Sequence, residues 1–506
     1  MAITYLDVTF AALGIYFLKR LLAPRQPAPF PPGPKGLPLV GNVADMPTVH
    51  EWKTFASWAE QYGDVIGVKI LGQPLIILNT AEHAFAMLDK KSSIYSERPT
   101  LMMGTVLVGW EKTLAMTKYG DRFREIRKML FGLMGTKSVV KKFEPLEELE
   151  THRFLRRVYE NPDKLTTAIR QTAGAIILNI SHGYEPKEKD DPIVGTVDLA
   201  TEQFSESTQP GAFLVDVMPI LRYVPAWFPG AGFQKKAALW RKTLLEMANI
   251  PHEIVKSKVA SGTAIPSFTS THLEKKDLSA QEEDNVKWAA ASLYSGGADT
   301  AIYGFYLAMT LHPEVQKKAQ AEIDSVIGND RLPTYADRAS LPYIEALLKE
   351  VFRWLPVAPL GLPHVAYEDD IYNGYYIPKG SLIIPNIWQM LHNPATYSSP
   401  LSFNPDRFLE TDGHAPERDP RDFCFGFGRR VCPGLNLADA STWLSIASAL
   451  AVFDITKAKD ESGREIVPET EMLPGTISHP RPFKCNIKPR SAKAEELITS
   501  VDFVSA

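Results

Sequence analysis

The chain has 506 residues, 55 of them basic and 59 acidic, and this near balance of charge gives no support for nucleic acid or a strongly charged ligand as a partner. Three cysteines, Cys424, Cys432 and Cys485, are too few for a disulfide framework, and the first two are not at a zinc spacing. We interpret the chain as one catalytic domain, residues 43–506, preceded by two short segments.

Residues 1–23 are predicted to form an N-terminal membrane anchor. The run from Ala2 to Leu22 is largely apolar, although Asp7 leaves it short of the roughly 20 apolar residues of a full span. Its positive charges, Lys19 and Arg20, follow the apolar run, which predicts a retained helix with the catalytic domain on the cytoplasmic side. A buried or amphipathic N-terminal helix is the alternative.

Residues 24–42 are predicted to be a proline-rich hinge. Residues 31–36 read Pro-Pro-Gly-Pro-Lys-Gly, which cannot form a helix and favours a stiff, extended chain. We expect this linker to hold the catalytic domain away from the bilayer.

The next part of the chain predicts a hairpin and then an apolar loop. From Asp64 to Asn79 the apolar residues alternate around Gly72, as in two paired strands. Leu101 to Trp110 is rich in methionine and valine and is predicted to be a loop. Its side chains could line a substrate pocket or simply fill the core.

Two further regions carry surface features. A basic helix is predicted from Tyr119, and its positive residues either form a solvated face or dock an acidic partner. The stretch from Leu214 to Phe233 collects apolar residues and prolines where no helix is expected. Such a loop could rest on a membrane surface.

A long central helix is predicted after Ser279 and Glu282, which form a capping-box pattern. No proline interrupts the run before Pro313, so the helix would be about 50 Å long. Its middle contains paired glycines, which cost about 1 kcal/mol each relative to alanine. A packing or functional gain is therefore needed there.

Downstream, Pro342 begins another predicted helix in which Glu350 and Arg353 share a face. The Asn373-Gly374 pair predicts a tight hairpin turn. Residues 425–434 then read Phe-Gly-Phe-Gly-Arg-Arg-Val-Cys-Pro-Gly, followed by an apolar helix from Leu435. Cys432 would thus lie just before a helix N-terminus, where amide donors favour a thiolate.

The ten-residue string resembles the haem-binding signature of the cytochrome P-450 superfamily of haem-thiolate monooxygenases. Phe425, Gly428, Arg430, Cys432 and Gly434 fill its five fixed positions. The resemblance implies a mainly α fold with small β-sheets (α+β), and haem b bound through a cysteine thiolate. It also implies the metal ligand Cys432, with Phe425 packed beside the sulfur and Arg430 paired with a haem propionate.

The central helix resembles the family's oxygen-binding motif at Gly296-Gly297-Ala298-Asp299-Thr300. This likeness implies that Gly297 lets haem and oxygen approach closely, and that Thr300 and Asp299 pass protons to dioxygen. Ala301 stands where many relatives have a second hydroxyl residue, so the relay would rest on Thr300 and water. Alternatively, the Thr300 hydroxyl only bonds its own backbone.

The resemblance also assigns roles outside the two central motifs. Arg127 and His364 are expected to contact the propionates, while Phe123 replaces a tryptophan that would donate a further bond. Glu350, Arg353 and Arg407 are expected to form a buried charge network. The expected pocket walls are Met102, Met103, Val106, Leu107, Val357, Leu360 and Ile477.

These features predict a monooxygenase at the endoplasmic reticulum membrane, with a single-pass anchor and electrons from NADPH-cytochrome P-450 reductase. The residues around Trp227 also resemble enzymes of fungal secondary metabolism. We expect a lipophilic substrate of the terpenoid type, with an aromatic, indole or polyketide metabolite as the alternative. A reductase-independent haem-thiolate isomerase or peroxygenase, and a haem sensor or carrier, are the rival functions.

Overall fold

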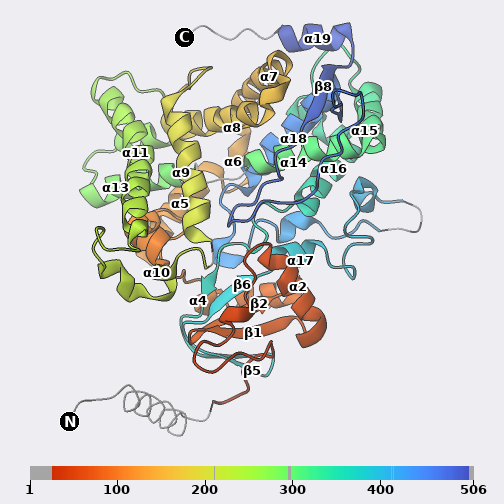
Figure 1. The fold of residues 1–506 in the computed structure, drawn as a ribbon. Helices are drawn as coiled ribbons and strands as arrows, with labels where there is room; N and C mark the ends of the chain where they lie inside the picture. Colours follow the sequence, from red (N-terminus) through yellow and green to blue (C-terminus); the bar gives the residue numbers. More distant parts are fainter. Residues whose placement is uncertain (1–25, 210, 294–297, 412, 414, 501–506) are drawn as a thin grey trace, which may run out of the picture.

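The computed structural model describes residues 26–500 except 210, 294–297, 412 and 414. Most of this part is helical (Figure 1). The longer helices are α2 (Glu51–Tyr62), α5 (Asp121–Met134), α7 (Glu144–Glu160), α8 (Leu165–His182), α9 (Pro192–Thr208), α11 (Gly232–Ala260), α13 (Ala280–Leu293), α14 (Ala298–Leu311), α15 (Pro313–Val326), α16 (Pro342–Trp354) and α18 (Leu435–Val452). The shorter ones are α3 (Ala81–Ala84), α4 (Ser92–Tyr95), α6 (Lys137–Val140), α10 (Leu214–Val217), α12 (Phe268–Leu273), α17 (Ile387–Leu391) and α19 (Ala492–Thr499).

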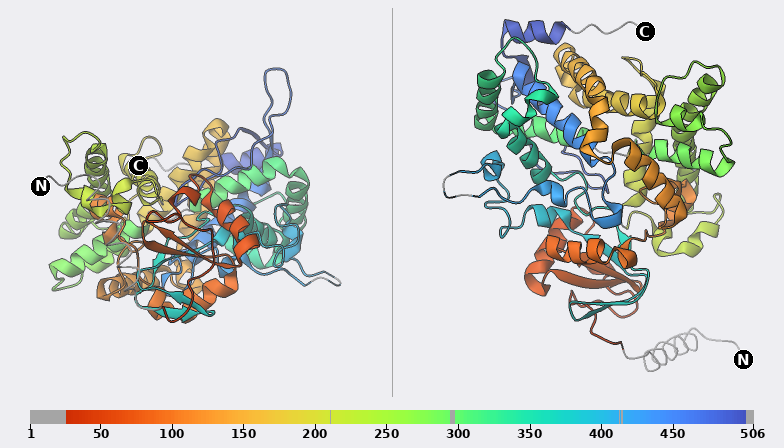
Figure 2. Two further views of the ribbon diagram at one scale, coloured as in Figure 1. Left: turned by 60° about the horizontal axis from the view of Figure 1, so that its bottom comes forward. Right: turned by 180° about the vertical axis from the view of Figure 1, so that it is seen from behind.

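The strands form three small sheets. Four of them pair in the order β1-β2-β6-β3, in which β2 and β6 are parallel and the other pairs are antiparallel. The two-stranded sheets are β4-β5 and β7-β8. Strand bounds are β1 Val65–Ile70, β2 Gln73–Leu78, β3 His364–Val365, β4 Asp370–Tyr372, β5 Tyr375–Ile377, β6 Leu382–Pro385, β7 Phe453–Lys457 and β8 Cys485–Pro489. Figures 1 and 2 place the four-stranded sheet at one end of the molecule and α19 at the other.

Helix α18 lies in the largest core cluster, because its hydrophobic side chains are distributed around the helix and most of its residues are buried. It packs against α7, α14, α15 and α16. Within the described part of the chain it is the helix whose length and apolar composition would suit a membrane span, and 72% of it is buried inside the fold. Its N-terminus is therefore a fixed point, and the Cys432 turn is attached to it.

Several local predictions are confirmed. Strands β1 and β2 pair around Gly72, which has a positive φ of 86°. The β4-β5 turn uses Asn373 and Gly374, both with positive φ, as a tight hairpin turn requires. The Ser279 and Glu282 hydrogen bonds form the predicted capping box at the start of α13.

Four predictions need correction or concern residues outside the described ones. The apolar stretch after Leu101, predicted to be a loop, is a π-helical turn at Met102–Val108. Its backbone amides bond carbonyls five residues earlier, as Val106 does to Leu101. The stretch after Leu214, where no helix was expected, contains α10 and a short 3-10 turn at Pro219–Tyr223. The long central helix is described as α13 and α14, and residues 294–297 between them, like the anchor segment 1–23, lie outside the described residues.

The described part of the segment predicted as a hinge contains a tight turn at Leu37–Gly41, and the residues before this turn are bonded to two of the sheets. The amide of Gly67 in β1 donates to the carbonyl of Pro32 at 2.8 Å, and the amide of Tyr376 in β5 donates to that of Pro29 at 2.8 Å. A Cβ on Gly33 would lie 2.3 Å from the carbonyl oxygen of Gly67, so this close contact requires glycine.

Candidate haem site

The Cys432 turn is shaped by its glycines. Gly428 has a φ of 52°, and a Cβ there would lie 2.2 Å from the carbonyl oxygen of Leu88. Only glycine fits both the conformation and the contact. The amide of Cys432 donates to the carbonyl of Phe425 at 2.8 Å, which closes the turn just before α18.

Cys432 lies just before the N-terminus of α18, as predicted, and is half-buried. Desolvation of the thiol has the largest effect on its pKa. Burial raises the pKa of Cys432, while the amide of Gly434, the charge of Arg127 and the amide of Leu435 act in the opposite direction. The amides of Gly434 and Leu435 thus favour the thiolate, as expected, but burial outweighs them in the protein without a metal. A coordinating metal ion would deprotonate the thiol.

Three arginines and a histidine lie near this turn, and we call Arg98, Arg127, Arg430 and His364 the cationic cluster. Arg127 is half-buried and the other three are buried. Arg127 Nη1 donates to the carbonyl of Val431 at 2.5 Å. Arg98 donates to the carbonyls of Ala115, Leu362 and Pro363, at 2.9, 2.6 and 2.8 Å.

Arg430 is the least satisfied member of the cationic cluster. Its Nε donates to the carbonyl of Ser96 at 2.8 Å and its Nη1 to that of Leu114 at 3.4 Å, but its buried Nη2 has no hydrogen-bond partner. The Phe123 ring lies 3.9 Å from the guanidinium carbon. Phe123 thus makes a cation-π contact with Arg430. It has no N–H donor like that of the tryptophan that the family resemblance leads one to expect at this position.

The charges of the cationic cluster repel one another. Burial lowers the pKa of Arg430 to about 10, and the nearby Arg127 lowers it further, while Glu97 raises it. The pKa of Arg98 falls well below its ordinary value because of burial and then Arg430. Among the described residues, no carboxylate lies within salt-bridge distance of Arg98, Arg127 or Arg430. The cluster therefore has an excess of buried positive charge.

His364 is held as a neutral donor to the backbone. Its Nδ1 lies 2.6 Å from the carbonyl oxygen of Tyr95, so Nδ1 carries the proton. Burial lowers the pKa of His364 well below its ordinary value, and Arg98 and Arg430 lower it further. An anion bound nearby would reverse the effect of these charges.

These residues fit an anionic cofactor such as haem. Two carboxylates would neutralise the cationic cluster and could accept from the orphaned Arg430 Nη2. The predicted contacts Arg127, His364 and Arg430 are brought together, whereas Gly297 lies outside the described residues. The sequence reasoning missed Arg98, whose available signal was a charged residue beside the apolar stretch 101–110.

Thr300 and Asp299 begin α14 and face different partners. The Thr300 hydroxyl oxygen lies 2.7 Å from His479 Nδ1. Asp299 is 4.0 Å from Arg170 Nε on α8. The Thr300 hydroxyl thus contacts a side chain, which differs from the alternative in which it bonds only its own backbone. His479 was not among the residues predicted from the sequence.

Glu350, Arg353 and Arg407 meet in one buried network on and beside α16. Arg353 Nε and Nη2 donate to the two carboxylate oxygens of Glu350 at 2.7 and 2.8 Å. Arg407 Nε lies 3.2 Å from Glu350, although the angle is too poor for a hydrogen bond, and Arg407 also pairs with Glu417 at 2.8 Å. Phe425, in the Cys432 turn, packs its ring against that of Phe352 in α16, with 5.3 Å between the ring centroids.

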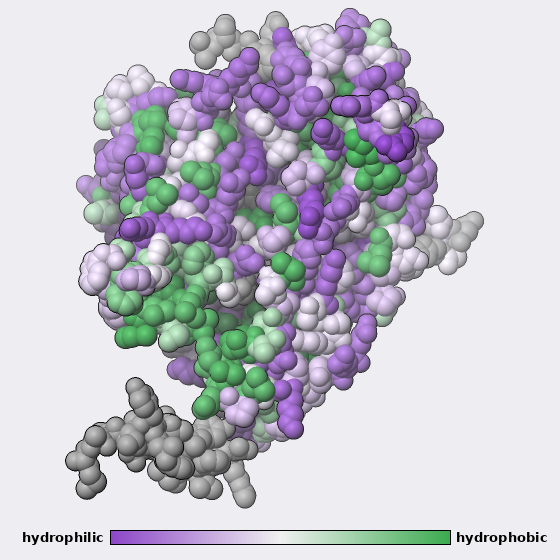
Figure 3. Space-filling model, in the orientation of Figure 1, coloured by the Kyte–Doolittle hydropathy of each residue, from purple (hydrophilic) through white to green (hydrophobic). Residues whose placement is uncertain are grey.

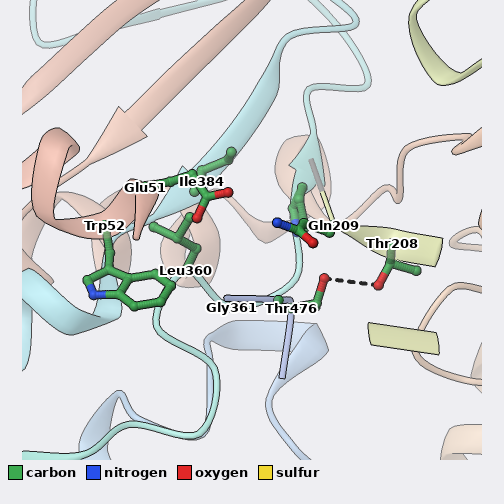
Figure 4. Close-up of a pocket in the computed structure, with 10 residues that line it drawn as sticks. Glu51, Trp52, Thr208, Gln209, Leu360, Gly361, Ile384 and Thr476 are labelled. Carbon is green, nitrogen blue, oxygen red and sulfur yellow. Dashed lines mark hydrogen bonds between the residues drawn. The ribbon is translucent and has the colours of Figure 1, made fainter. Parts of the chain in front are cut away.

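The predicted pocket walls divide between two places. Most lie in or against one apolar cluster with α9, α11 and α13: Met102, Met103, Val106, Leu107 and Ile477. Leu360 lines a small pocket with Trp52, Ile384 and Thr476, where Thr208 and Thr476 share a 2.9 Å hydrogen bond (Figure 4). Val357 accepts a backbone bond from Ser478 at 2.9 Å, which ties it to the segment that carries Ile477.

Comparisons with known proteins show what the whole chain is similar to. A family model described as Cytochrome P450 matches residues 31–487. The chain is 54% identical over 98% of its length to Cytochrome P450 monooxygenase 208 of Postia placenta, covering 98% of that protein. It is 49% identical to Cytochrome P450 monooxygenase claR of Ampulloclitocybe clavipes, over 99% and 93% of the two chains. It is 40% identical to the O-methylsterigmatocystin oxidoreductase of Aspergillus flavus, over 97% and 94%.

Proposed function

Because the chain belongs to the cytochrome P450 family and is a haem-dependent monooxygenase, we propose that Cys432 ligates the iron of haem b. The cationic cluster would receive the two propionates. One observation carries this assignment: the buried Arg430 Nη2 has no hydrogen-bond partner. Among the described residues, no carboxylate lies at salt-bridge distance from the arginines of the cationic cluster. Haem carboxylates are the anions that would complete it.

Each residue has a physical task in this proposal. Haem, when bound, supplies the reductive activation of dioxygen, and thiolate ligation favours O–O cleavage. Cys432 donates electron density through its sulfur, and the amides of Gly434 and Leu435 hold that sulfur in place. Thr300, with Asp299 beside it, holds and moves protons, while Gly297 would leave room for oxygen at the haem face. The reaction takes up two protons and two electrons as it turns RH and dioxygen into ROH and water.

The substrate we propose is a neutral lipophilic metabolite, with a terpenoid-type intermediate of fungal secondary metabolism as the first candidate. The support is the apolar character of the walls, because Met102, Met103 and Leu107 lie in a cluster of hydrophobic side chains. The second candidate is an aromatic, indole or polyketide metabolite. It is favoured by the likeness to a protein named for its action on O-methylsterigmatocystin.

We propose NADPH-cytochrome P450 reductase as the electron donor. The support is the group of exposed lysines on and after α5: Lys128, Lys137, Lys141 and Lys142. Arg122 contributes less to this surface because it pairs with Asp284 at 3.0 Å. Docking through these lysines would be steered by charge and weakened by salt.

We propose that the enzyme lies on the endoplasmic reticulum membrane, with residues 1–23 as a single-pass anchor. The support in the described chain is an apolar surface over α10 and the residues that follow it (Figure 3). Leu214, Ile220, Tyr223, Trp227 and Phe228 are all more than half exposed there. Aromatic and aliphatic side chains of this kind suit the interface of a bilayer.

The test is a carbon monoxide difference spectrum of the reduced purified protein, with Cys432→Ser in parallel. We expect a strongly red-shifted Soret band that the variant loses. A band typical of histidine-ligated haem, or a protein without haem, would contradict the Cys432 assignment. Product formation from a terpenoid panel and from O-methylsterigmatocystin, with reductase and NADPH, would then separate the two substrate classes. A Thr300→Ala variant that forms product normally would favour the isomerase or peroxygenase rival.

A further inference from the structure

A charged cavity of about 350 Å³ lies beside the N-terminal end of α14, outside the residues that would hold the haem. Its walls come from α8, α9, α14 and the segment 473–479. The titratable groups that line it include Arg170, Asp198, Glu202, Asp299 and His479. The Glu202 side chain is 58% exposed, so the cavity is in contact with solvent.

His479 connects this cavity to Thr300. It lines the cavity, and its Nδ1 lies 2.7 Å from the hydroxyl oxygen of the buried Thr300. The backbone holds His479 in place, because its carbonyl accepts from the amide of Leu473 at 2.7 Å and the neighbouring Ser478 amide donates to Val357 at 2.9 Å. A fixed imidazole thus stands between solvent-accessible acids and a buried hydroxyl.

The surrounding charges suit proton uptake. Burial raises the pKa of Asp198 to about 6, against the effect of Arg170, so this carboxyl exists in both protonation states close to neutral pH. Burial lowers the pKa of His479, which leaves the ring neutral with a free lone pair at neutral pH. The charged groups that act on the ring are Asp299 and Glu202, which favour its protonation, and Arg170, which opposes it.

We propose that His479 is the proton relay between the charged cavity and Thr300. Nε2 accepts a proton from a cavity acid or water as Nδ1–H gives its proton to Thr300 Oγ1, and the threonine hydroxyl gives its own proton to the oxygen being reduced. One proton enters and one leaves, no electrons move through the ring, and bulk water restores the acid. This role rests on the proposed role of Thr300 and extends it with a residue from a distant part of the chain.

The test compares His479→Ala, His479→Gln and wild type as holoenzymes with reductase, NADPH and dioxygen, without an organic substrate. Dioxygen then takes up two electrons and two protons to give hydrogen peroxide, so NADPH oxidation still reports proton delivery. We expect His479→Ala to lower the rate by at least about tenfold and to increase its solvent isotope effect. The loss should be smaller than the roughly 100-fold typical of an acid–base group, because water can partly replace the imidazole. A wild-type rate and isotope effect in His479→Ala, with Thr300→Ala impaired, would overturn the relay.

The glutamine variant separates relay from positioning. Its amide can keep a hydrogen bond to Thr300 but cannot take up a proton. We expect His479→Gln to keep the infrared stretch of carbon monoxide bound to the reduced holoenzyme, which reports donors near the ligand, and yet to lose rate as His479→Ala does. A wild-type rate would show that the hydrogen bond alone suffices and would overturn the relay.

The cavity offers a matched control. Glu206 lines the same cavity but pairs with Lys236, so Glu206→Gln should oxidise NADPH as wild type does. Asp198→Asn should lower the rate, by about threefold, because other acids and water still supply protons. Equal losses in both variants would assign the effect to the charge of the cavity and overturn a specific route. Failure of the haem assignment is distinguishable, because the red-shifted carbon monoxide band would then be missing in every variant.

Discussion

Two buried groups of arginines in this protein differ in how their charge is balanced. Arg353 and Arg407 share Glu350, Arg407 has Glu417 as well, and Arg353 donates further to the carbonyls of Leu391, Pro400 and Ser402. In the cationic cluster Arg98, Arg127 and Arg430 are satisfied mainly by carbonyls, and one Arg430 nitrogen has no partner. The first group is complete within the protein, whereas the second needs an anion.

The difference predicts opposite responses to charge removal. A buried group whose charges are paired loses stability when one partner goes, because the other is left uncompensated. A buried group with excess positive charge gains relief from repulsion when one charge is removed. The following variants test this contrast.

The largest effect is expected at the paired network. Glu350→Ala or Arg353→Ala should cost about 3–5 kcal/mol of unfolding free energy and abolish haem incorporation. Haem content of the purified protein and its unfolding in urea measure the two effects. Lys493→Ala is the matched control, because Lys493 and Glu496 have the same spacing on an exposed helix, where a pair contributes at most about 1 kcal/mol. A folded, fully haem-loaded Glu350→Ala protein would contradict the prediction.

An intermediate effect is expected at Arg430. Arg430→Met should leave the unfolding free energy of the haem-free protein within about 1 kcal/mol of wild type, since lost hydrogen bonds and relieved repulsion offset each other. Haem affinity should fall about 10- to 100-fold, as expected for loss of a charge-assisted hydrogen bond. A haem titration measures it. The neighbouring Arg429 is exposed and bonds Tyr119, so Arg429→Met should bind haem normally. Large destabilisation of the haem-free protein by Arg430→Met would break the comparison.

The smallest effect is expected in the pH dependence of two histidines, one from each region. Burial and then arginine charge lower the pKa of both His364 and His392, the latter to about 3. In the unfolded chain each histidine takes up a proton below about pH 6.5, whereas in the folded protein it stays neutral. The free energy of unfolding therefore falls as the pH drops below 6.5, by up to about 1.4 kcal/mol per pH unit for each histidine.

Haem should separate these two histidines. Propionates beside His364 would raise its pKa and reduce the acid loss, but they would not act on His392, which bonds Trp388. His364→Gln should therefore flatten the fall in stability from pH 7 to 5.5 more without haem than with it, whereas His392→Gln should flatten it equally in both states. Urea unfolding at the two pH values measures this. An equal response of both variants to haem would place the propionates away from His364.

Local chemistry made part of this molecule predictable. The turn at Asn373 and Gly374 requires residues that accept positive φ, and the Cys432 turn depends on fixed spacing within ten residues. The contacts that complete the site are long-range. Ser96 and Arg430 are 334 residues apart, and Thr300 and His479 are 179 apart. No periodicity or spacing in the chain encodes such pairs, because tertiary packing brings them together.

The charge of the thiol shows a second limit. The amides at the start of α18 could be foreseen from the helix that follows Gly434, but the burial that raises the pKa of Cys432 depends on everything packed around it. Similarly, the aromatic residue at position 123 could be read as a lost donor, whereas its contact with Arg430 depends on how α5 meets the Cys432 turn. In both cases the sequence showed the residues themselves, but the side chains packed around them in the fold determine the pKa of Cys432 and the contact of Phe123.

The backbone bonds of the hinge limit how the catalytic domain can be oriented. Pro29 and Pro32 are bonded to β5 and β1, so the chain from residue 29 onward is attached to two of the three sheets. The chain that precedes these two bonds therefore joins the catalytic domain at one place, beside β1 and β5. Inserting residues before Pro29 would lengthen the segment that precedes the catalytic domain. Weakening the hydrogen bond between Gly67 and Pro32 would let the angle between that segment and the domain vary more widely.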